Sequence, residues 1–586
     1  MGKKWNLNPI LKIKDFNCLY LELEKDLEKM RGFVDLLGPD ISKKKFREIL
    51  EFSEISEEKI ARLGALPGLM EAVNQRDAEA KLLKSRVENL ALKWSEVGIK
   101  MSLWLKGKGD PHLDDRNAKR IFGVVKDLQY GLKRSRLLAK YSLLEREENI
   151  VVNKDINGMG VLEELREMIA AEMEYEIEIR GRKKKLKTQS ELLALVYDPD
   201  SETRKAAYGA LLTKQKENLP KFFAIYQAVV KDWAYETKLR GYKNAMAVRN
   251  LANDVPNEAV EKLLESCSKN RGIFQEYFKW KAKELGKEKL ERSDLYAPIA
   301  KKERKYTISE TKELVLGGLS KFSDKFYKFG KELIDGEQID WMPKLNKRSG
   351  AFCATISPKI KPYIMLNFTG KQRDVSTLAH EVGHGIHSMY ASGLHPSAQN
   401  ANLPLAETAS TLAEMILFEE ILKQEKDGEI RKALLADKMA DAYATICRQN
   451  YFVLFEKEAH KKIPEGMRAE DLSNLYFNNL KEQLGESVEI SPDFRYEWSY
   501  ISHIFASPFY CYAYNFGGLL SLGLYARYKE NPGVWRKRIE TILAAGGSRN
   551  PEEVLREVKI DIRNPGFWQE SFEIIREWQR KLIKIK

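Results

Sequence analysis

The sequence predicts a mainly α-helical protein with a small β component. Apolar residues recur at three- and four-residue spacing from the start of the chain, which is typical of helices that bury one face. One short apolar run has the character of a strand, and no internal repeat or low-complexity linker interrupts the pattern. With 586 residues, 43% of them apolar, the chain exceeds a single ordinary domain and can build a large core.

An N-terminal helical lobe is expected over residues 1–195. Apolar residues at helical spacing mark two early helices in it: Leu23, Leu27 and Met30, and then Leu83, Val87, Leu90, Trp94 and Val97. Residues 197–208 read YDPDSETRKAAY, a turn in which Asp200 or Ser201 can cap a new helix. The boundary is therefore placed just before this turn, and residues 196–586 form the second predicted domain.

Residues 377–390 read TLAHEVGHGIHSMY and hold three of the seven histidines. An apolar stripe at helical spacing runs along this stretch, and His380, His384 and His387 fall on the opposite side. Residues four apart on a helix lie one above the other, so His380 and His384 can bind one zinc ion. Glu381 lies beside that point and can take a proton from a metal-bound water. The pattern is H-E-x-x-H, the metallopeptidase signature, and its chance occurrence in a chain with so few histidines is rare.

A zinc site that acts on a substrate needs a third protein ligand and one open position. Residues 402–422 form a second amphipathic helix, with Glu407 and Glu414 on the side opposite its apolar stripe. Glu407 can bind the metal, and Glu414 can accept a histidine N–H; a solvated surface glutamate is the alternative for Glu407. His387 and His395 are expected to contact substrate or support the ligands.

A short apolar strand is expected over residues 363–368, directly after Pro362. A strand this near the metal helix in sequence can pair with an extended peptide and hold its backbone, so Tyr363 is a predicted substrate-binding residue. The alternative is a buried hairpin strand without a role in substrate binding.

Hydrogen-bond donors for a reacting carbonyl are expected near the C-terminus. His503, Tyr510 and Tyr514 share one side if their stretch is helical, although Pro508 argues against an uninterrupted helix. Such donors stabilise the oxyanion that forms when a peptide bond is attacked. Tyr512 is a further candidate, and for each tyrosine a place in the buried core is the alternative.

The net charge of +13 raises the question of nucleic-acid binding. Basic residues are mixed with acidic ones along most of the chain, as in REVKIDIR at residues 556–563. The densest basic run, RGRKKKLK at residues 180–187, follows YEIEI and fits a solvated hairpin tip better than a nucleic-acid patch. No nucleic-acid partner is expected.

Membrane insertion and secretion are not expected either. Residues 504–526 carry no charge over a length sufficient for a membrane span, but Pro508, Asn515 and four tyrosines favour a buried helix. The five cysteines are far apart and form no C-x-x-C pair, and the N-terminus has no apolar run long enough for a signal peptide. These features predict a cytoplasmic protein.

The chain resembles a known family. His380-Glu381-Val382-Gly383-His384, with Glu407 in LAETAS 23 residues after His384, is similar to the oligoendopeptidase F branch of the thimet oligopeptidase family of zinc metallopeptidases. Further segments resemble family segments in the family's order: KWKAKELGKEKLERSDLYAPI at 279–299, WMPKLNKRSGAFC at 341–353, PYIMLNFTG at 362–370 and YISHIFASPFYCYAYNFG at 500–517. The likeness is dense from about residue 195 to the C-terminus and looser before it.

This resemblance implies a large, two-lobed helical shell around a deep substrate channel, with a small β-sheet beside the zinc helix in a zincin-like arrangement. It implies one zinc ion per chain bound by His380, His384 and Glu407, with Glu381 as general base and acid. It also implies that His503 and tyrosines of the same region face the zinc.

The predicted function is zinc-dependent hydrolysis of internal peptide bonds in short peptides. Zinc, together with His503 and tyrosine donors, would stabilise the oxyanion. A zinc carboxypeptidase on a related helical fold is the nearest alternative. A basic helical binding protein with a structural metal site is an alternative of a different class, although a structural zinc normally has four protein ligands and no use for a general base.

Overall fold

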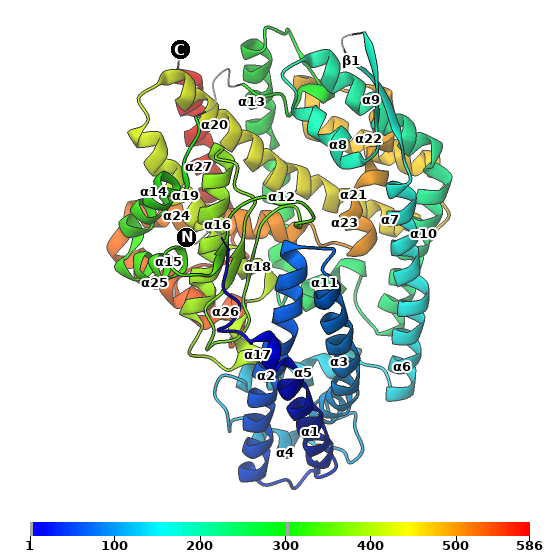
Figure 1. Cartoon of the computed structure of the whole chain (residues 1–586). Coiled ribbons are helices and arrows are strands. Elements are labelled where there is room, and N and C mark those ends of the chain that lie inside the picture. The colour runs from blue at the N-terminus through cyan, green and yellow to red at the C-terminus, as the bar shows by residue number, and fades with distance from the viewer. Residues whose placement is uncertain (1–3, 180, 300–303, 586) are drawn as a thin grey trace. The chain divides into compact units, whose positions relative to one another are not determined.

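The structure is a computed structural model that describes residues 4–179, 181–299 and 304–585 (Figure 1). The described chain is mostly helical with small sheets, as predicted. Its contacts group into two compact units: the first comprises Met1–Glu145, Arg304–Gln424 and Arg527–Asp561, and the second comprises Arg146–Glu303, Glu425–Ala526 and Ile562–Lys586. These units interleave along the sequence, so the predicted boundary after residue 195 does not coincide with them and stays a prediction, as does the channel.

The first unit contains the N-terminal helices, one three-stranded sheet and the helices around it. Its elements are α1 (Phe16–Val34), α2 (Lys43–Val73), α3 (Ala78–Leu105), α4 (Asp115–Ile121), α5 (Gln129–Leu138), α14 (Ile308–Phe322), α15 (Asp324–Ile334), β4 (Ile339–Asp340), β5 (Phe352–Ala354), β6 (Tyr363–Met365), α16 (Gln372–Tyr390), α17 (Pro396–Gln399), α18 (Leu403–Ala406), α19 (Thr408–Gln424), α25 (Pro532–Ala545) and α26 (Pro551–Glu557).

The helices α1, α2 and α3 lie side by side, as the blue ribbons of Figure 1 show. They bury their apolar faces against one another. Most periodic residues that predict α1 and α3 are in the core, with Leu23 and Leu90 at most 2% exposed, while Val87 and Trp94 are partly buried against it. Ser42 directly precedes α2 and Asp77 directly precedes α3, and each accepts a backbone N–H of the first turn as the N-cap. Burial of these faces therefore accounts for the predicted pattern.

The three-stranded sheet has the order β4–β6–β5, with β6 parallel to β4 and antiparallel to β5. Ile364 of β6 pairs with Ile339 on one side and with Cys353 on the other. The central strand β6 is fully buried, as expected for a strand covered on both faces. Both β5 and β6 pack against α16, so the small sheet lies beside the helix with the H-E-x-x-H pattern, as predicted.

The second unit is also mostly helical. Its elements are α6 (Glu145–Lys154), α7 (Gly160–Ala171), β1 (Tyr175–Ile179), β2 (Arg182–Leu186), α8 (Gln189–Ala194), α9 (Ser201–Glu217), α10 (Leu219–Leu239), α11 (Ala245–Ala252), α12 (Asn257–Lys269), α13 (Arg271–Glu284), β3 (Leu290–Glu291), α20 (Gly428–Ala442), α21 (Gln449–Lys462), α22 (Ala469–Leu484), β7 (Val488–Glu489), α23 (Ser502–Ala506), most of α24 (Tyr512–Glu530) and α27 (Pro565–Lys584).

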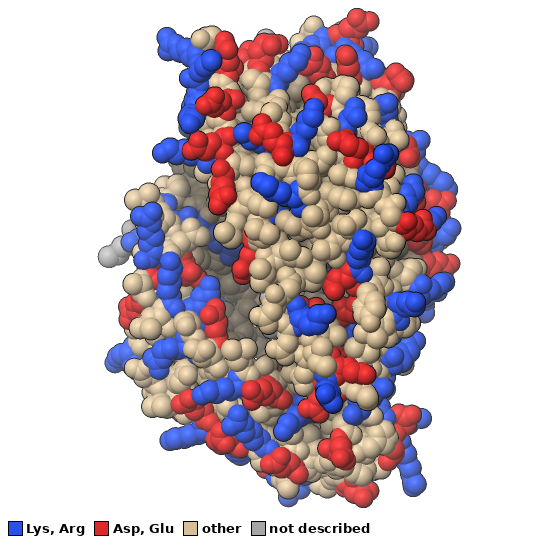
Figure 2. Space-filling model, turned by 90° about the vertical axis from the view of Figure 1, so that its right-hand side faces the viewer, with Lys and Arg blue, Asp and Glu red and all other residues tan. Residues whose placement is uncertain are grey.

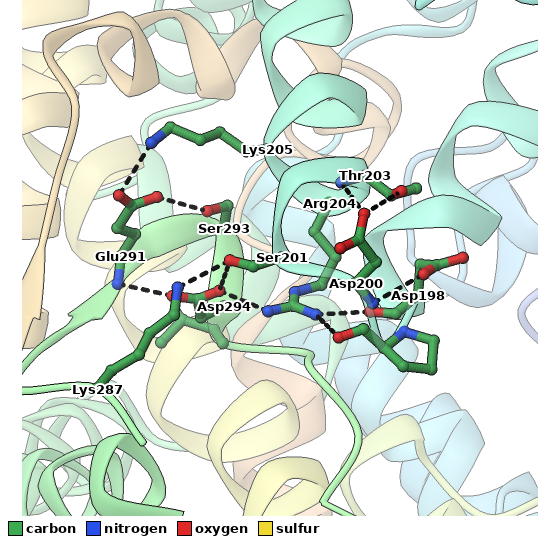
Figure 3. Close-up of polar contacts among 12 residues, drawn as sticks. Asp198, Asp200, Ser201, Thr203, Arg204, Lys205, Lys287, Glu291, Ser293 and Asp294 are labelled. Carbon is green, nitrogen blue, oxygen red and sulfur yellow. Dashed lines mark hydrogen bonds and ion pairs between the residues drawn. The ribbon is translucent and has the colours of Figure 1, made fainter. Parts of the chain in front are cut away.

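A buried polar cluster secures the start of α9, at the turn where the sequence predicts a new helix (Figure 3). Asp200 is the N-cap of α9 and accepts the backbone N–H of Thr203 at 3.0 Å, as predicted. Arg204 donates to Asp294 Oδ1 at 2.6 Å, and Lys287 donates to Asp294 Oδ2 at 2.7 Å. Asp294 and Arg204 are almost completely buried, and these partners compensate for the loss of water around their charges.

The basic run expected at a hairpin tip lies mainly along β2, which forms a hairpin with β1, and Lys187 follows the strand; residue 180 lies outside the described residues. Glu176 pairs with Lys185 across the hairpin and Glu178 with Lys183, so an acidic strand faces each of these lysines. Figure 2 shows acidic and basic side chains interspersed over one face of the molecule. This mixing agrees with a solvated surface.

The uncharged run at residues 504–526 is divided between α23, a turn and α24. Among the described residues, none of the helices combines the length and apolar character needed to cross a membrane. All five cysteines are free thiols, and Cys267, Cys447 and Cys511 are buried.

Candidate active site

The metal-binding residues predicted from the sequence meet in the first unit, where α16 packs against α19. The Nε2 atoms of His380 and His384 are 3.1 Å apart, and Glu407 Oε2 lies 3.4 Å from each of them. Ligand atoms at about 2.0–2.1 Å from a tetrahedral zinc ion lie roughly 3.3 Å from one another. The three atoms therefore fit three corners of a zinc tetrahedron.

Local sequence explains how α16 presents its histidines. The apolar stripe of α16 is fully buried and consists of Val375, Leu378, Ala379, Val382 and Ile386. The opposite side keeps the side chains of His380 and His384 29% and 25% exposed, and Glu407 is 33% exposed. A site with this much exposed surface leaves room for a fourth, non-protein ligand, which distinguishes it from a closed structural zinc site.

Glycine 383 allows the two helices to approach closely. A Cβ atom at Gly383 would lie 2.5 Å from Ser410 Cα and 2.7 Å from the carbonyl oxygen of Ala409. Real Cβ atoms do not come this close to backbone, so only glycine permits the contact. Glu407 directly precedes α19, and the close approach therefore helps set the position of its carboxylate relative to His380 and His384.

Two side chains on α19 form hydrogen bonds with the candidate ligands. Glu414 Oε1 accepts a hydrogen bond from His380 Nδ1 at 2.6 Å, which is the contact expected for it from the sequence. Ser410 donates its hydroxyl to Glu407 Oε2 at 2.8 Å and is fully buried. Sequence reasoning missed Ser410, although its position three residues after Glu407 on one helix is a signal that could have found it.

The carboxylates around His380 and His384 favour a positive charge at this point, whether on an imidazole or on a metal ion. Burial disfavours a charged imidazole, but the hydrogen bond and charge of Glu414, with Glu407 and Glu381, raise the pKa of His380 to about 9. Burial likewise works against an ionised Glu407, yet His384 and His380 outweigh it and lower the pKa of this carboxyl to about 2. Three carboxylates thus surround two histidines, as in a site built for a metal ion.

Glu381 follows His380 on α16 and is 7% exposed. Burial raises the pKa of its carboxyl, and the two ligand histidines oppose this shift. Cys353 of β5 is close enough for the Glu381 charge to raise the pKa of its thiol further, beyond the effect of burial. A carboxyl with a raised pKa beside His380, His384 and Glu407, called the metal group below, can accept a proton as a general base and later return it as a general acid.

His387, His395 and Tyr363 are not among the three converging side chains, although His387 lies close enough to His384 and Glu407 for their charges to affect its pKa. His387 is buried, with Nδ1 3.4 Å from the carbonyl oxygen of Ala406, and burial lowers its pKa to about 4. His395 is buried and caps α17 by accepting the backbone N–H of Ser397.

Tyr363 is also buried, and its hydroxyl donates to the carbonyl oxygen of Asn6 at 2.7 Å. The expectation that an extended peptide pairs with this strand is wrong, because β4 and β5 occupy both edges of β6. The strand is buried, as in the alternative.

The C-terminal candidates lie in the second unit. His503 Nε2 is 3.3 Å from the hydroxyl of Tyr514, and the ring of Tyr510 is stacked on His503 with 6.0 Å between ring centroids. The rings of Tyr510 and Tyr514 are 5.3 Å apart. Tyr512 is separate: it is fully buried and accepts a hydrogen bond from Asn253 at 2.7 Å. The core alternative thus applies to Tyr512, while the other three form one polar aromatic cluster.

This cluster is not on one uninterrupted helix. The helix α23 ends at Ala506 and α24 begins at Tyr512, with Pro508 in the turn between them. The interruption that Pro508 suggests is present. The turn, and not helical spacing, places Tyr510 beside His503.

Comparison with known proteins agrees with these features. The sequence pattern of peptidase family M3 matches residues 194–574. An oligoendopeptidase F homolog of Borreliella burgdorferi is 28% identical over 467 residues, which cover 79% of this chain and 78% of that protein.

Two solved structures share the fold. A crystal structure from Chlamydophila abortus has a TM-score of 0.86 at 22% identity and covers 100% of this chain and 98% of its own. The oligoendopeptidase F of Enterococcus faecium has a TM-score of 0.72 at 20% identity over 98% of this chain and 99% of its own. The family match spans well over half of the sequence, and the chain therefore belongs to peptidase family M3.

Proposed function

We propose that this peptidase is a zinc-dependent oligoendopeptidase that cuts internal bonds of short peptides. The observation that carries the proposal is the convergence of His380, His384 and Glu407, whose three ligand atoms lie 3.1 to 3.4 Å from one another. The names of its relatives support the substrate class, because the aligned protein of Borreliella burgdorferi is an oligoendopeptidase F homolog. The described part of the chain holds one such group, and we propose one zinc ion per chain on this basis.

Zinc bound by these residues would act as a Lewis acid that polarises the scissile carbonyl and lowers the pKa of water, so that the water can lose a proton as it attacks this carbonyl. Glu381 is the group that moves protons: it accepts one from the attacking water and delivers it to the nitrogen of the departing amine. Its raised pKa suits it to hold that proton between the two events. Glu414 and Ser410 orient His380 and Glu407 and take no part in proton transfer.

His503, Tyr510 and Tyr514 are proposed to donate hydrogen bonds to the oxyanion. Burial and the nearby arginines Arg166 and Arg448 lower the pKa of His503, which favours a neutral imidazole at neutral pH. A neutral imidazole and phenol hydroxyls can both donate a hydrogen bond. Loss of one such donor in comparable sites costs roughly 3 to 4 kcal/mol of transition-state stabilisation.

An extended peptide is proposed to bind along β5. Within the described sheet, β5 pairs with β6 on one side only, and it packs against α16, which carries Glu381. The free N–H and C=O groups of an edge strand can pair with a peptide backbone without reading its side chains.

The free thiols agree with a reducing compartment, and we propose the cytoplasm as the place of action.

The proposal is tested by mass spectrometry of products from peptides of about five to twenty residues with both termini blocked. Internal cuts that disappear with a zinc chelator and return with zinc are the expected result. Trimming of free-ended peptides alone would instead support the zinc carboxypeptidase alternative. Zinc-loaded protein that cuts neither kind of peptide would contradict the proposal.

A further inference from the structure

The turn between α23 and α24 contains an unusual backbone conformation. Phe509 has a φ of 59°, in the left-handed region. This region is sparsely populated by non-glycine residues, and a bulky aromatic residue there is an outlier. Backbone strain of this kind persists only where the surrounding structure holds it, and it gathers at functional sites.

Two polar side chains from other helices hold this turn. Glu456 of α21 accepts the backbone N–H of Phe509 through Oε1 at 2.8 Å and is completely buried. Arg249 of α11 donates through Nη2 to the hydroxyl of Ser507 at 2.7 Å and through Nε to the carbonyl oxygen of Pro508 at 3.1 Å. Three consecutive residues of the turn are thus fixed by hydrogen bonds from outside it.

The side chain of Phe509 is anchored as well. Its ring is 1% exposed and lies 4.7 Å from the ring of His460, also on α21. Burial lowers the pKa of His460 to about 3, so this imidazole is neutral and acts as a packing partner. The backbone and the side chain of Phe509 are therefore held by the same helix.

The turn decides where Tyr510 lies. Tyr510 follows Phe509 directly, and its ring is stacked on His503 at an interplanar angle of 12°. A right-handed conformation at Phe509 would send the chain in another direction and remove Tyr510 from His503. We propose that Glu456 and Arg249 are positioning residues, which hold the strained turn at Phe509 and thereby fix Tyr510 against His503 for catalysis. This inference rests on the proposed function, in which the His503 cluster supplies donors to the reaction.

Glu456 acts as a neutral acceptor. Burial raises the pKa of its carboxyl to about 8, with the Phe509 N–H and the charge of Arg249 opposing the shift. The acceptor of the Phe509 N–H at neutral pH is therefore the oxygen of a protonated carboxyl. Glutamine offers a neutral acceptor oxygen of the same geometry, and leucine offers a similar volume without an acceptor.

The test compares Glu456→Leu, Glu456→Gln and Arg249→Met with the wild type in cutting one terminally blocked peptide. Glu456→Leu and Arg249→Met are expected to lower kcat by about 10- to 100-fold and to change KM by less than about twofold, because misplaced donors weaken the transition state more than substrate binding. Glu456→Gln should keep kcat within about threefold of the wild type. Zinc content should be unchanged in all three, since the metal group belongs to the other unit.

Tyr451→Phe is the matched control. Tyr451 is buried on the same helix and donates to Glu482 at 3.1 Å, away from the turn. Loss of the Tyr451 hydroxyl should lower thermal stability and leave kcat unchanged.

A rescue variant separates positioning from folding. Glycine adopts a positive φ without steric cost, so Phe509→Gly in the Glu456→Leu background should recover at least about threefold in kcat. If Glu456 contributes to stability alone, the double variant should lose further activity instead, because the phenylalanine ring is removed from the core. If the wild type is active and both Glu456→Leu and Arg249→Met keep its kcat, the positioning role is wrong. A zinc-loaded wild type without activity would contradict the proposed function itself.

Discussion

His380 Nδ1 lies 2.6 Å from Glu414 Oε1, and His380 Nε2 faces His384 and Glu407 on the other side of the ring. The raised pKa of His380 favours a charged ring when no metal is bound. A metal binds the neutral ring, which has one N–H and one lone pair, and donation to Glu414 then places the proton on Nδ1. The lone pair of Nε2 is then directed to the point where the three ligand atoms converge. One carboxylate on α19 thus determines the tautomer of a histidine on α16.

Replacement of Glu414 by leucine should weaken zinc binding by about 10- to 100-fold, because His380 loses the acceptor that fixes its tautomer and orientation. Competition with a fluorescent chelator measures this affinity without reference to activity. Glu420→Leu is the control, since Glu420 lies on the same helix and contacts Gln424 instead of a ligand. Equal zinc affinity in the two variants would contradict the role of Glu414.

Replacement of Gly383 by alanine should lower both thermal stability and zinc affinity. The new Cβ would collide with the backbone of Ser410 and Ala409, so α19 and Glu407 must move away. The helix propensity gain of about 1 kcal/mol is too small to offset this collision. Gly385→Ala is the control, because the nearest atoms to its Cβ belong to side chains, with the flexible end of Leu333 at 2.6 Å and Cys353 Sγ at 3.7 Å. Similar zinc affinity in the two alanine variants would count against close packing as the device that places Glu407.

Glu381→Gln should reduce turnover by at least about 100-fold and leave zinc bound at one ion per chain. Glutamine has nearly the same shape but cannot accept a proton at neutral pH, and it is not one of the three converging ligands. Zinc analysis and single-turnover cleavage of a blocked peptide measure the two effects separately. A fully active variant would exclude Glu381 as the general base.

The tyrosines should differ in their effect on catalysis. Tyr510→Phe and Tyr514→Phe are each expected to lower kcat by about 10-fold or more, because each removes a hydroxyl from the His503 cluster. Tyr512→Phe should instead lower the melting temperature and leave kcat near the wild-type value, since its hydroxyl bonds to Asn253 in the core. A loss of kcat confined to Tyr512→Phe would reverse this assignment.

The stability of the second unit should depend on the protonation of Glu456. The pKa of this carboxyl rises from 4.5 to about 8 on burial, so the unfolded chain releases its proton at lower pH than the folded chain. Between these two values the unfolded state binds fewer protons, and the free energy of unfolding falls as pH rises, by up to a few kcal/mol.

Glu456→Gln removes this titration. Its melting temperature relative to the wild type should therefore increase from pH 5 to pH 8, as followed by circular dichroism. A constant difference across this range would show that Glu456 is already ionised in the folded protein.

Several parts of this protein follow from the sequence alone. The stripe of α16 and the side on which His380 and His384 lie follow from helical geometry, since residues four apart face the same way in any α-helix. The same rule placed Glu414 opposite the apolar stripe of α19, where it meets His380. Asp200 was recognisable as a cap because capping depends on a side chain and the backbone two or three residues ahead.

Other parts were decided by tertiary structure. Spacing along the chain does not say which strands pair, so the central position of β6, and with it the burial of Tyr363, required the contacts of β4 and β5. The positions of Tyr510 and Tyr512 follow a turn with a positive φ at Phe509, whose N–H is accepted by Glu456, 53 residues earlier in the sequence. Local periodicity carries information over a few turns of chain, whereas packing joins residues far apart in sequence, and only packing could separate the tyrosine beside His503 from the tyrosine in the core.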